Sequence, residues 1–437
     1  MRKKFVVIFI SVILLFVLSG CDSGSSTYST EPRSVNTMNI SNADSMFIAK
    51  LSSVVNVQSL NSASSDSETE KLFKITADGY IEEVKYYSVD EQGNKTEQTI
   101  TKTPVAVYNT DSEYVFVNFG HDDYNIESGY LVKKDSGSVY DLSNVGYPIQ
   151  TINGFANDNV IKSDSKGNFY YLSNISSGYS GSVIDGVKKL DINNLTGETI
   201  TPSHHAIDYF TVDKNGNIAY HGQDDKTREY IERLKKANDS MDFLESKHFW
   251  TGTNNDIYYS IEEENLNAYS YGIKNISIDN SFNTEVNDYA TNLENMDLRI
   301  TGTYKLEFND KIFLTDMFDP EVYEVENPDN SPRIVDSVGS AISDKITLAA
   351  ASPNYYYIYS AAGELIRVNP YDDNVTQLLD GEYDVYKMVV SDDDVITFNG
   401  LRMSDSHVVI SQINSQGNIK IISDTLDGEV KELIQIQ

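Results

Sequence analysis

The chain has 437 residues, 40% of them hydrophobic, so it is long enough to bury a substantial core. Its net charge of −32 at neutral pH repels nucleic-acid phosphates and anionic headgroups, which argues against a nucleic-acid partner and against membrane contact through a basic patch. The single cysteine, Cys21, excludes an internal disulfide, so packing alone must hold the fold.

The first twenty residues have the layout of a secretory signal peptide. A basic segment, Met1–Lys4, precedes an apolar run, Phe5–Leu18, that is short for a membrane span. The run ends in Leu18-Ser19-Gly20-Cys21, which resembles the lipobox of bacterial lipoproteins. That resemblance implies cleavage before Cys21 and acylation of its thiol and its new amino group, with palmitate among the attached chains. Residues 1–20 are therefore expected to be removed, which changes the net charge from −32 to −35.

The next segment, residues 21–70, is expected to be a flexible tether. Fourteen of its fifty residues are serine, and such a composition favours an unfolded linker that lets the body stand off the bilayer. Apolar residues between Met46 and Val55 interrupt it and are compatible with a short docked helix or strand. Together with the lipobox, the tether predicts an exported protein, anchored by lipid to a bacterial membrane on its periplasmic side or at the cell surface.

From residue 71 to residue 437 the sequence predicts short strands separated by tight turns. The second strand of a repeated two-strand unit begins seven times, at Tyr114, Phe169, Ile218, Ile257, Ile312, Tyr355 and Val395, at a mean interval of about 47 residues. The tetrad Leu379–Glu382 also recurs 47 residues later as Leu426–Glu429. Turns such as Asp164–Asn168 and Asp213–Asn217 precede these strands, and Asp, Asn and Gly favour such turns. Lys226–Ser246 is compatible with either an outer hairpin or a short amphipathic helix.

Four strands every forty to fifty-five residues is the spacing of β-propeller blades, and residues 71–437 resemble β-propellers in general. The predicted fold is all-β, with eight four-stranded blades. The last strand, Val430–Gln437, is expected to complete a blade with three N-terminal strands, Lys71–Thr76, Tyr80–Ser88 and Lys95–Thr103. Seven blades with an extra N-terminal hairpin is the alternative.

The sequence contains no phosphate-binding loop, no nucleophile elbow and no Cys/His metal motif. Carboxylate runs such as Glu262–Glu264 and Asp392–Asp394 lack the order of a calcium loop and are typical of solvated turns. No cofactor is therefore predicted, although a divalent metal is compatible with the histidines described next.

All six histidines fall in or beside the loops on one face of the expected propeller. With neighbouring carboxylates they give a candidate ligand face, which comprises His121, Asp122, His204, His205, His221, Asp224 and His407, with His248 beside it. Converging imidazoles and carboxylates could bind a metal or sense pH. The simpler interpretation is that long polar connections collect histidines by their length alone.

The sequence favours a non-catalytic binding or scaffolding module of the cell envelope, whose partners would be envelope proteins or glycans. The alternative is an extracytoplasmic carbohydrate-active hydrolase or lyase with its site on the histidine-bearing face. Both classes occur on propeller folds, so missing catalytic motifs decide between them here.

Overall fold

The structure is a computed structural model that describes residues 36–40, 46–53, 70–75, 81–98, 103–110, 113–120, 126–148, 161–174, 184–203, 205–224, 226–244, 249–252, 256–263, 270–294, 304–308, 311–315, 321–326, 333–423 and 428–436. In these ranges the chain is almost entirely β-structure, with one short helix, α2 (Asp336–Gly339). The strands form antiparallel sheets, which we call sheets A to H.

Sheets A and B contain the N-terminal strands. Sheet A has the order β6 (Lys95–Gln98), β5 (Tyr86–Val89), β1 (Asn36–Met38), β10 (Ser138–Asp141), β9 (Ile126–Lys133), β8 (Tyr114–Gly120) and β7 (Thr103–Asn109). Sheet B has the order β36 (Gly428–Ile436), β2 (Met46–Ser53), β3 (Glu70–Ile75) and β4 (Ile81–Glu83). Sheet B therefore joins the end of the chain to its beginning.

The other sheets follow the chain in order. Sheet C contains β11 (Tyr147–Pro148), β12 (Ile161–Ser163), β13 (Phe169–Asn174), β14 (Ile184–Asp191) and β15 (Thr196–Thr199). Sheet D contains β16 (His205–Val212), β17 (Ile218–Asp224), β18 (Tyr230–Lys235) and β19 (Met241–Phe243), and sheet E contains β20 (Phe249–Thr251), β21 (Ile257–Glu263), β22 (Ser270–Ile278) and β23 (Thr284–Glu294). Sheet F contains β24 (Tyr304–Phe308), β25 (Lys311–Thr315), β26 (Val322–Glu326) and β27 (Arg333–Ile334), and sheet G contains β28 (Ile346–Ala351), β29 (Tyr356–Ser360), β30 (Glu364–Val368) and β31 (Val375–Asp380). Sheet H contains β32 (Tyr383–Val390), β33 (Ile396–Arg402), β34 (His407–Ile413) and β35 (Ile419–Ser423).

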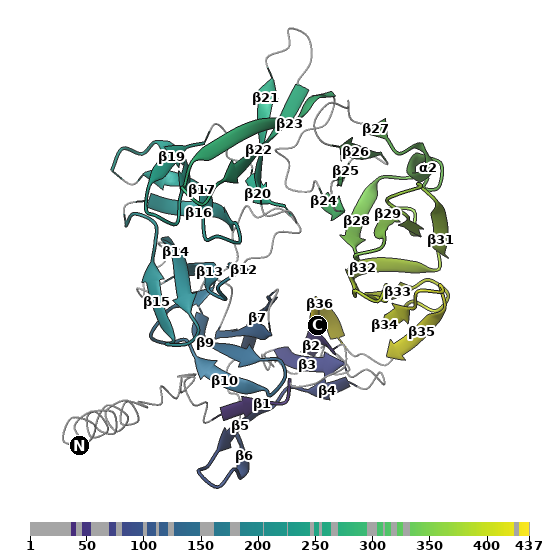
Figure 1. Cartoon of the computed structure of the whole chain (residues 1–437). Coiled ribbons are helices and arrows are strands. Elements are labelled where there is room, and N and C mark those ends of the chain that lie inside the picture. The colour runs from purple at the N-terminus through teal and green to yellow at the C-terminus, as the bar shows by residue number, and fades with distance from the viewer. Residues whose placement is uncertain are drawn as a thin grey trace, which may run out of the picture.

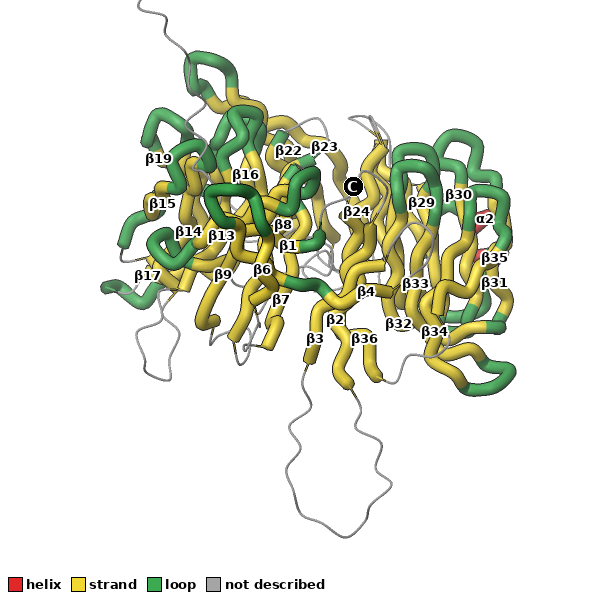
Figure 2. The backbone as a smooth tube through the Cα atoms, turned by 90° about the horizontal axis from the view of Figure 1, so that it is seen from below, coloured by secondary structure: helices red, strands yellow, loops and turns green. Residues whose placement is uncertain are grey.

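The sheets stand side by side around a common centre, with one end strand of each sheet facing inward (Figure 1). Seen from below, their strands run roughly parallel to the axis of this ring (Figure 2). Strand β36 contacts β7 of sheet A and β32 of sheet H. A radial arrangement of antiparallel sheets is the architecture of a β-propeller, so the predicted fold class is confirmed at this level.

The core lies between neighbouring sheets, because alternate residues of a strand point to opposite faces. In β29, Tyr356 and Ile358 pack with residues of sheet F, whereas Tyr357 and Tyr359 pack with residues of sheet H. The described residues form eight apolar clusters, and each joins two adjacent sheets, in the order A–C–D–E–F–G–H–B–A. The cluster between sheets C and D also contains Ile126 of sheet A. Burying one large apolar side chain contributes about 1.5–3 kcal/mol, so these clusters hold the sheets together.

Recurrent hairpin turns position the strands. In the part of the chain that the structure describes, five turns share one pattern, in which an Asp or Asn side chain accepts hydrogen bonds from backbone N–H groups two and four residues later. They begin at Asp90, Asp164, Asp213, Asp279 and Asn414. The fourth residue has positive φ and is glycine in four of them, while Phe282 takes φ 62° in the fifth. This is a three-residue hairpin loop that ends in a left-handed residue, as the turn chemistry predicted for 164–168 and 213–217.

The predicted strand positions are confirmed to within one residue. Strands β8, β13, β17 and β21 begin at the predicted residues, and β25, β29 and β33 begin one residue away. The ambiguous segment after Lys226 forms the hairpin β18–β19 rather than a helix. Alternation and turn chemistry were sufficient here because both act over a few residues.

The N-terminal strand assignment was wrong in part. Strands β1 and β2 lie inside residues 21–70, the range assigned to the tether, and β2 occupies a place in sheet B that was given to Lys95–Thr103. The predicted strand Tyr80–Ser88 is divided into β4 of sheet B and β5 of sheet A. The physical reason for the exchange of β6 and β2 is their content of apolar side chains. Strand β6 has none, and all its residues are exposed at the outer edge of sheet A, whereas β2 begins Met-Phe-Ile-Ala. Sheets A and C also have more than four strands each.

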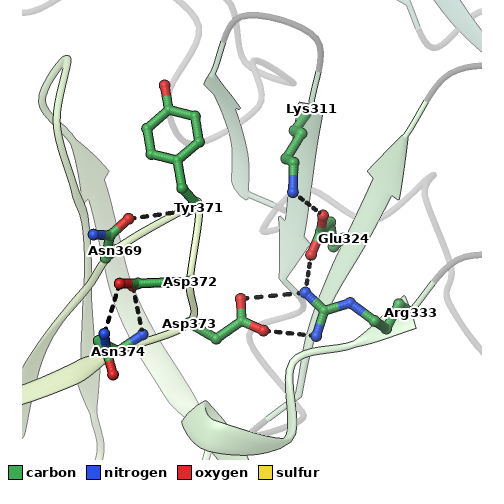
Figure 3. A network of polar contacts seen from close by, with 8 residues as sticks. All are labelled: Lys311, Glu324, Arg333, Asn369, Tyr371, Asp372, Asp373 and Asn374. Atoms are coloured by element: carbon green, nitrogen blue, oxygen red, sulfur yellow. Dashed lines mark hydrogen bonds and ion pairs between the residues drawn. The ribbon is translucent and has the colours of Figure 1, made fainter.

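Ionic contacts also link neighbouring sheets. Glu324 of β26 has only 4% of its side chain exposed and accepts a hydrogen bond from Lys311 Nζ at 2.5 Å and another from Arg333 (Figure 3). Arg333 of sheet F also binds Asp373, in the β30–β31 turn of sheet G, at 2.7 and 3.2 Å. The two carboxylates raise the pKa of the Arg333 guanidinium. This network fixes the outer part of the F–G interface.

Buried tyrosines make the fold sensitive to alkali. Burial raises the pKa of Tyr220 to about 12, and it also raises the pKa values of Tyr171 and Tyr356. A raised folded-state pKa gives stability that is complete below the unfolded pKa of 10.0 and is lost as pH rises through the folded pKa. We expect the urea midpoint to fall between pH 10 and pH 12, in step with tyrosinate absorbance at 295 nm. Complete tyrosine ionisation at pH 10 without loss of stability would contradict this.

Candidate functional site

The candidate site lies at the end of sheet D where β16 begins and β17 ends. His205 is the first residue of β16 and is paired in register with Asp224, the last residue of β17. The pairing shifts between Ile207 and Tyr209, so β16 carries a bulge opposite Gly222. A Cβ on Gly222 would lie 2.0 Å from the carbonyl oxygen of Ala206, so only glycine fits there.

His205 contacts a hydroxyl and a carboxylate. Its Nδ1 lies 3.1 Å from the Tyr220 hydroxyl and its Nε2 lies 3.8 Å from Asp224 Oδ2. Tyr220 lies two residues before Gly222 on the same face of β17, and the backbone of the β16 bulge occupies the space that a side chain at Gly222 would need. Burial raises the pKa of Tyr220 to about 12, so its hydroxyl stays protonated at neutral pH.

The remaining contacts of Asp224 and Tyr220 hold the neighbouring turn and the outer strand in place. Asp224 Oδ1 accepts hydrogen bonds from the backbone N–H groups of Lys226 at 2.8 Å and Thr227 at 3.2 Å, which holds the β17–β18 turn. The Tyr220 hydroxyl also lies 3.5 Å from Met241 Sδ of the outer strand. His205 is only 8% exposed. We call His205, Tyr220 and Asp224 the sheet D cluster. It could hold or move a proton at the imidazole, but the His205 ring is almost entirely buried.

The predicted face is brought together only in part. His221 follows Tyr220 and points to the opposite face of sheet D, where its Nε2 lies 3.6 Å from Glu232 Oε1 and its ring stacks on Tyr230. His407 begins β34 of sheet H, on the other side of the ring from sheet D, and its exposed ring lies 3.6 Å from Asp405. His205 and Asp224 are therefore adjacent, and His221 lies on the other face of sheet D. Strand β34, which begins with His407, lies across the ring from sheet D (Figure 1).

Several predicted residues lie outside the described ranges. These are Cys21, His121, Asp122, His204 and His248, so their placement stays a prediction. No group of three or more His, Cys, Asp or Glu side chains within the described ranges could hold a metal ion. The sheet D cluster offers a metal only one imidazole, one carboxylate and one tyrosine hydroxyl, which come from β16 and β17.

Sequence reasoning missed Tyr220, Gly222 and the bulge. A bulge leaves no composition signal, yet the order aromatic–polar–Gly in Tyr220–Gly222 recurs as Phe398–Gly400 in sheet H. There the pairing of β32 shifts between Val385 and Lys387, and a Cβ on Gly400 would lie 2.4 Å from the carbonyl oxygen of Asp384. This repeated tripeptide was the available signal.

Bulges recur at the inner strands. Among the described strands the register of the inner strand shifts in sheets A, B, D, G and H. Each shift leaves one extra residue on the inner strand, and bulges of this kind re-aim side chains near functional sites. In sheet H the extra residue is Tyr386, which is 46% exposed. Register shifts also occur between strands further out, in the pairs β8–β9, β13–β14, β22–β23, β30–β31 and β34–β35.

Replacing His205 tests whether the cluster is integral to the fold. We expect His205→Ala to lower the free energy of unfolding by about 1–3 kcal/mol, because it removes a buried ring and leaves the Tyr220 hydroxyl without its imidazole partner. His407→Ala, at an exposed ring, should change it by less than about 0.5 kcal/mol. Urea denaturation of both variants measures the difference, and equal effects would contradict a structural role for His205.

Comparison with known proteins gives similarity of overall structure alone. No family model matches the chain, and no curated protein matches its sequence. Among solved structures, a eukaryotic initiation factor is 11% identical with a TM-score of 0.42, covering 87% of this chain and 84% of its own. An oligogalacturonate lyase from Vibrio parahaemolyticus is 11% identical with a TM-score of 0.41, covering 79% and 87%. The Dos1 propeller is 11% identical with a TM-score of 0.40, covering 83% and 92%. Similarity at this level says nothing about what the chain binds.

In the described ranges no helix is long and apolar enough to cross a membrane.

Proposed function

We propose that the chain is an exported, lipid-anchored β-propeller that serves as a non-catalytic binding or scaffolding module in a bacterial cell envelope. In this proposal the eight sheets are eight blades, and the ring closes where β36 from the C-terminus pairs with β2 from the N-terminus. The eight clusters that each contain residues of two adjacent sheets support this closed arrangement. The lipobox Leu18–Cys21 supports export and anchoring.

The observation that carries the non-catalytic assignment is the burial of His205. A general base must reach a substrate proton at hydrogen-bond distance, and His205 is 8% exposed with Tyr220 against its Nδ1. Its carboxylate neighbour, Asp224, holds the β17–β18 turn through two backbone N–H groups. These contacts favour a rigid end of sheet D that presents a surface to a partner.

Anchoring is tested by replacing the acylated residue. We expect Cys21→Ser to move the protein from the membrane fraction to the soluble extracytoplasmic fraction and to abolish its labelling by an alkyne analogue of palmitate. The physical reason is that one or more acyl chains supply the membrane affinity of an otherwise acidic body. Persistent labelling of Cys21→Ser, or an unlabelled wild-type chain, would contradict lipidation at this residue. Capture of the lipidated protein from its own envelope then identifies the partner.

A hydrolase or lyase is the second candidate, favoured by one arrangement. Tyr220 places a protonated hydroxyl 3.1 Å from His205, and Asp224 lies on the other ring nitrogen, which is the order of groups in an acid–base relay. Screening the wild-type chain on glycan and ester substrates tests it. Turnover that disappears in His205→Gln and persists in His407→Gln would establish the enzyme and overturn the binding module.

A further inference from the structure

The first two described strands form a separate element, which we call the N-terminal arm and define as residues 36–40 and 46–53. Strand β1 inserts into sheet A between β10 and β5, with Asn36 paired to both Val139 and Ser88. Strand β2 inserts into sheet B between β36 and β3, with registered pairs from Met46–Ile436 to Ser53–Gly428. The arm therefore occupies an internal position in two different sheets.

The arm is fixed at the A–B interface by a small set of contacts. The side chain of Asn39 donates to the carbonyl of Glu83 at 3.1 Å and accepts from the N–H of Lys85 at 2.6 Å, while its backbone N–H donates to the carbonyl of Lys85 at 3.2 Å. Residues 83–85 are the point where the chain passes from β4 of sheet B to β5 of sheet A. On either side of Asn39, Met38 is 2% exposed and Ile40 is 1% exposed. We call Met38, Asn39 and Ile40 the latch.

The latch side chains belong to the core of this interface. Met38 and Ile40 pack in one cluster with Leu72 and Val84 of the sheet B side and with Val107, Val117 and Val132 of sheet A. Removing them would leave cavities between adjacent sheets and weaken the hold on the arm. The arm is thus held by a buried interface of its own.

The chain between β2 and β3 is longer than a hairpin turn needs. Sixteen residues, 54–69, join β2 to β3, although these strands are adjacent and antiparallel. Two to five residues are enough to connect such strands. The pairing of β1 and β2 with their neighbours therefore sets where the arm lies.

We propose that the N-terminal arm fastens the lipid anchor to the propeller by strand addition. A cut within residues 54–69 would then leave the body on the membrane, held through the arm, and the latch would control its release. This inference rests on the proposed lipidation of Cys21, which lies fifteen residues before β1.

The experiment uses the full lipidated chain on phospholipid vesicles. A site for a sequence-specific protease replaces residues 61–67, and a C-terminal tag reports the body in the vesicle pellet after complete cleavage. At least nine-tenths of the wild-type body should remain in the pellet. With Asn39→Ala and Ile40→Ser combined, release after the cut should be at least five-fold faster, and Gln92→Ala, in an exposed turn, should behave as wild type. Thermal unfolding of the uncut variants checks that each is folded.

A second cleavage site separates the outcomes. The same site placed within residues 24–34, before the arm, should release every variant. Release of the wild-type body by the cut at 61–67 would overturn the proposal, as would equal retention of the latch variant and wild type. If the uncut body is not on the vesicles, lipidation at Cys21 has failed instead. The arm is then tested with the N-terminus immobilised on resin, where the nicked wild-type body should stay bound and the nicked latch variant should elute.

Discussion

Ending the chain after Thr425 is expected to abolish the cooperative unfolding transition, because it removes β36. This strand of nine residues pairs with β2 along its whole length and contacts β7 and β32 of the two neighbouring sheets. Without it, β2 loses one ladder of backbone hydrogen bonds and becomes a free edge, and the interface between sheets H and B loses its inner part. Circular dichroism on heating and size-exclusion chromatography measure the result, which should be an expanded or aggregated chain.

A single substitution in β36 removes a packed side chain and leaves the strand at its full length. Leu433 is 6% exposed and packs with Ile75 of sheet B and Ile410 of sheet H. We expect Leu433→Ala to lower the free energy of unfolding by about 2–4 kcal/mol, within the range for buried leucines. Ile421→Ala is the matched control, since Ile421 is 38% exposed in the outer strand β35, and it should cost less than about 1 kcal/mol. A truncated chain with the melting curve of the intact protein would contradict the role of β36.

Replacing Glu324 by alanine should lower the free energy of unfolding by about 2–4 kcal/mol. Glu324 is 4% exposed and binds both Lys311, whose side chain is 17% exposed, and Arg333 (Figure 3). Removal of one member of a buried pair leaves a poorly solvated charge, which costs about 3–5 kcal/mol when burial is complete. We place the expectation lower because the Arg333 side chain is 52% exposed and regains water. Chemical denaturation at constant pH measures the change.

An exposed ion pair provides the control for Glu324. Asp405 binds Arg402 at 2.6 Å, but its side chain is 39% exposed, so Asp405→Ala should cost about 0–1 kcal/mol. Glu324→Gln should recover part of the loss, because the amide oxygen still accepts from one cation. Equal costs for Glu324→Ala and Asp405→Ala would show that the network in Figure 3 adds nothing to the F–G interface.

The local features of the fold could be predicted because they depend on a few adjacent residues. The turn at Asp213 needs an acceptor side chain and a left-handed residue, and both are visible as Asp213 and Gly216. The strand that follows begins at Ile218, as predicted. Alternation likewise places neighbouring tyrosines, such as Tyr356 and Tyr357, on opposite faces of one sheet.

Pairings between distant segments could not be predicted in the same way. The apolar residues from Met46 to Val55 were compatible with a docked strand, but nothing in their serine-rich surroundings identified its partner, β36, nearly four hundred residues away. The transfer of the chain from β4 to β5 depends on Asn39, forty-four residues before Glu83. No local pattern records such a contact. Strand β6 follows a regular hairpin turn at Asp90, but its polar side chains place it outside the core.

The sequence placed His205 and Asp224 among seven residues of one candidate face, without pairing them and without their geometry. Spacing along the chain placed both residues at one end of neighbouring strands, and they lie 3.8 Å apart. The bulge between Ile207 and Tyr209, whose backbone fills the space beside Gly222, is a property of two paired strands, so sequence spacing alone does not show that His205 meets Tyr220. His221 was grouped with His205 by sequence, but strand alternation turns it to the other face.

Closure of the ring is tested most directly by a cross-link between the two ends of the chain. Lys50 of β2 and Glu432 of β36 are paired in register, so cysteines at these two positions, in a chain with Cys21→Ser, should form a disulfide within one molecule. The oxidised monomer should migrate faster on a denaturing gel than the reduced monomer, and the pair Lys50 with Lys420, which lies in β35 of sheet H, should form no such bond. Absence of the 50–432 bond, or a bond that joins only two separate chains, would contradict a ring closed by strands from both termini.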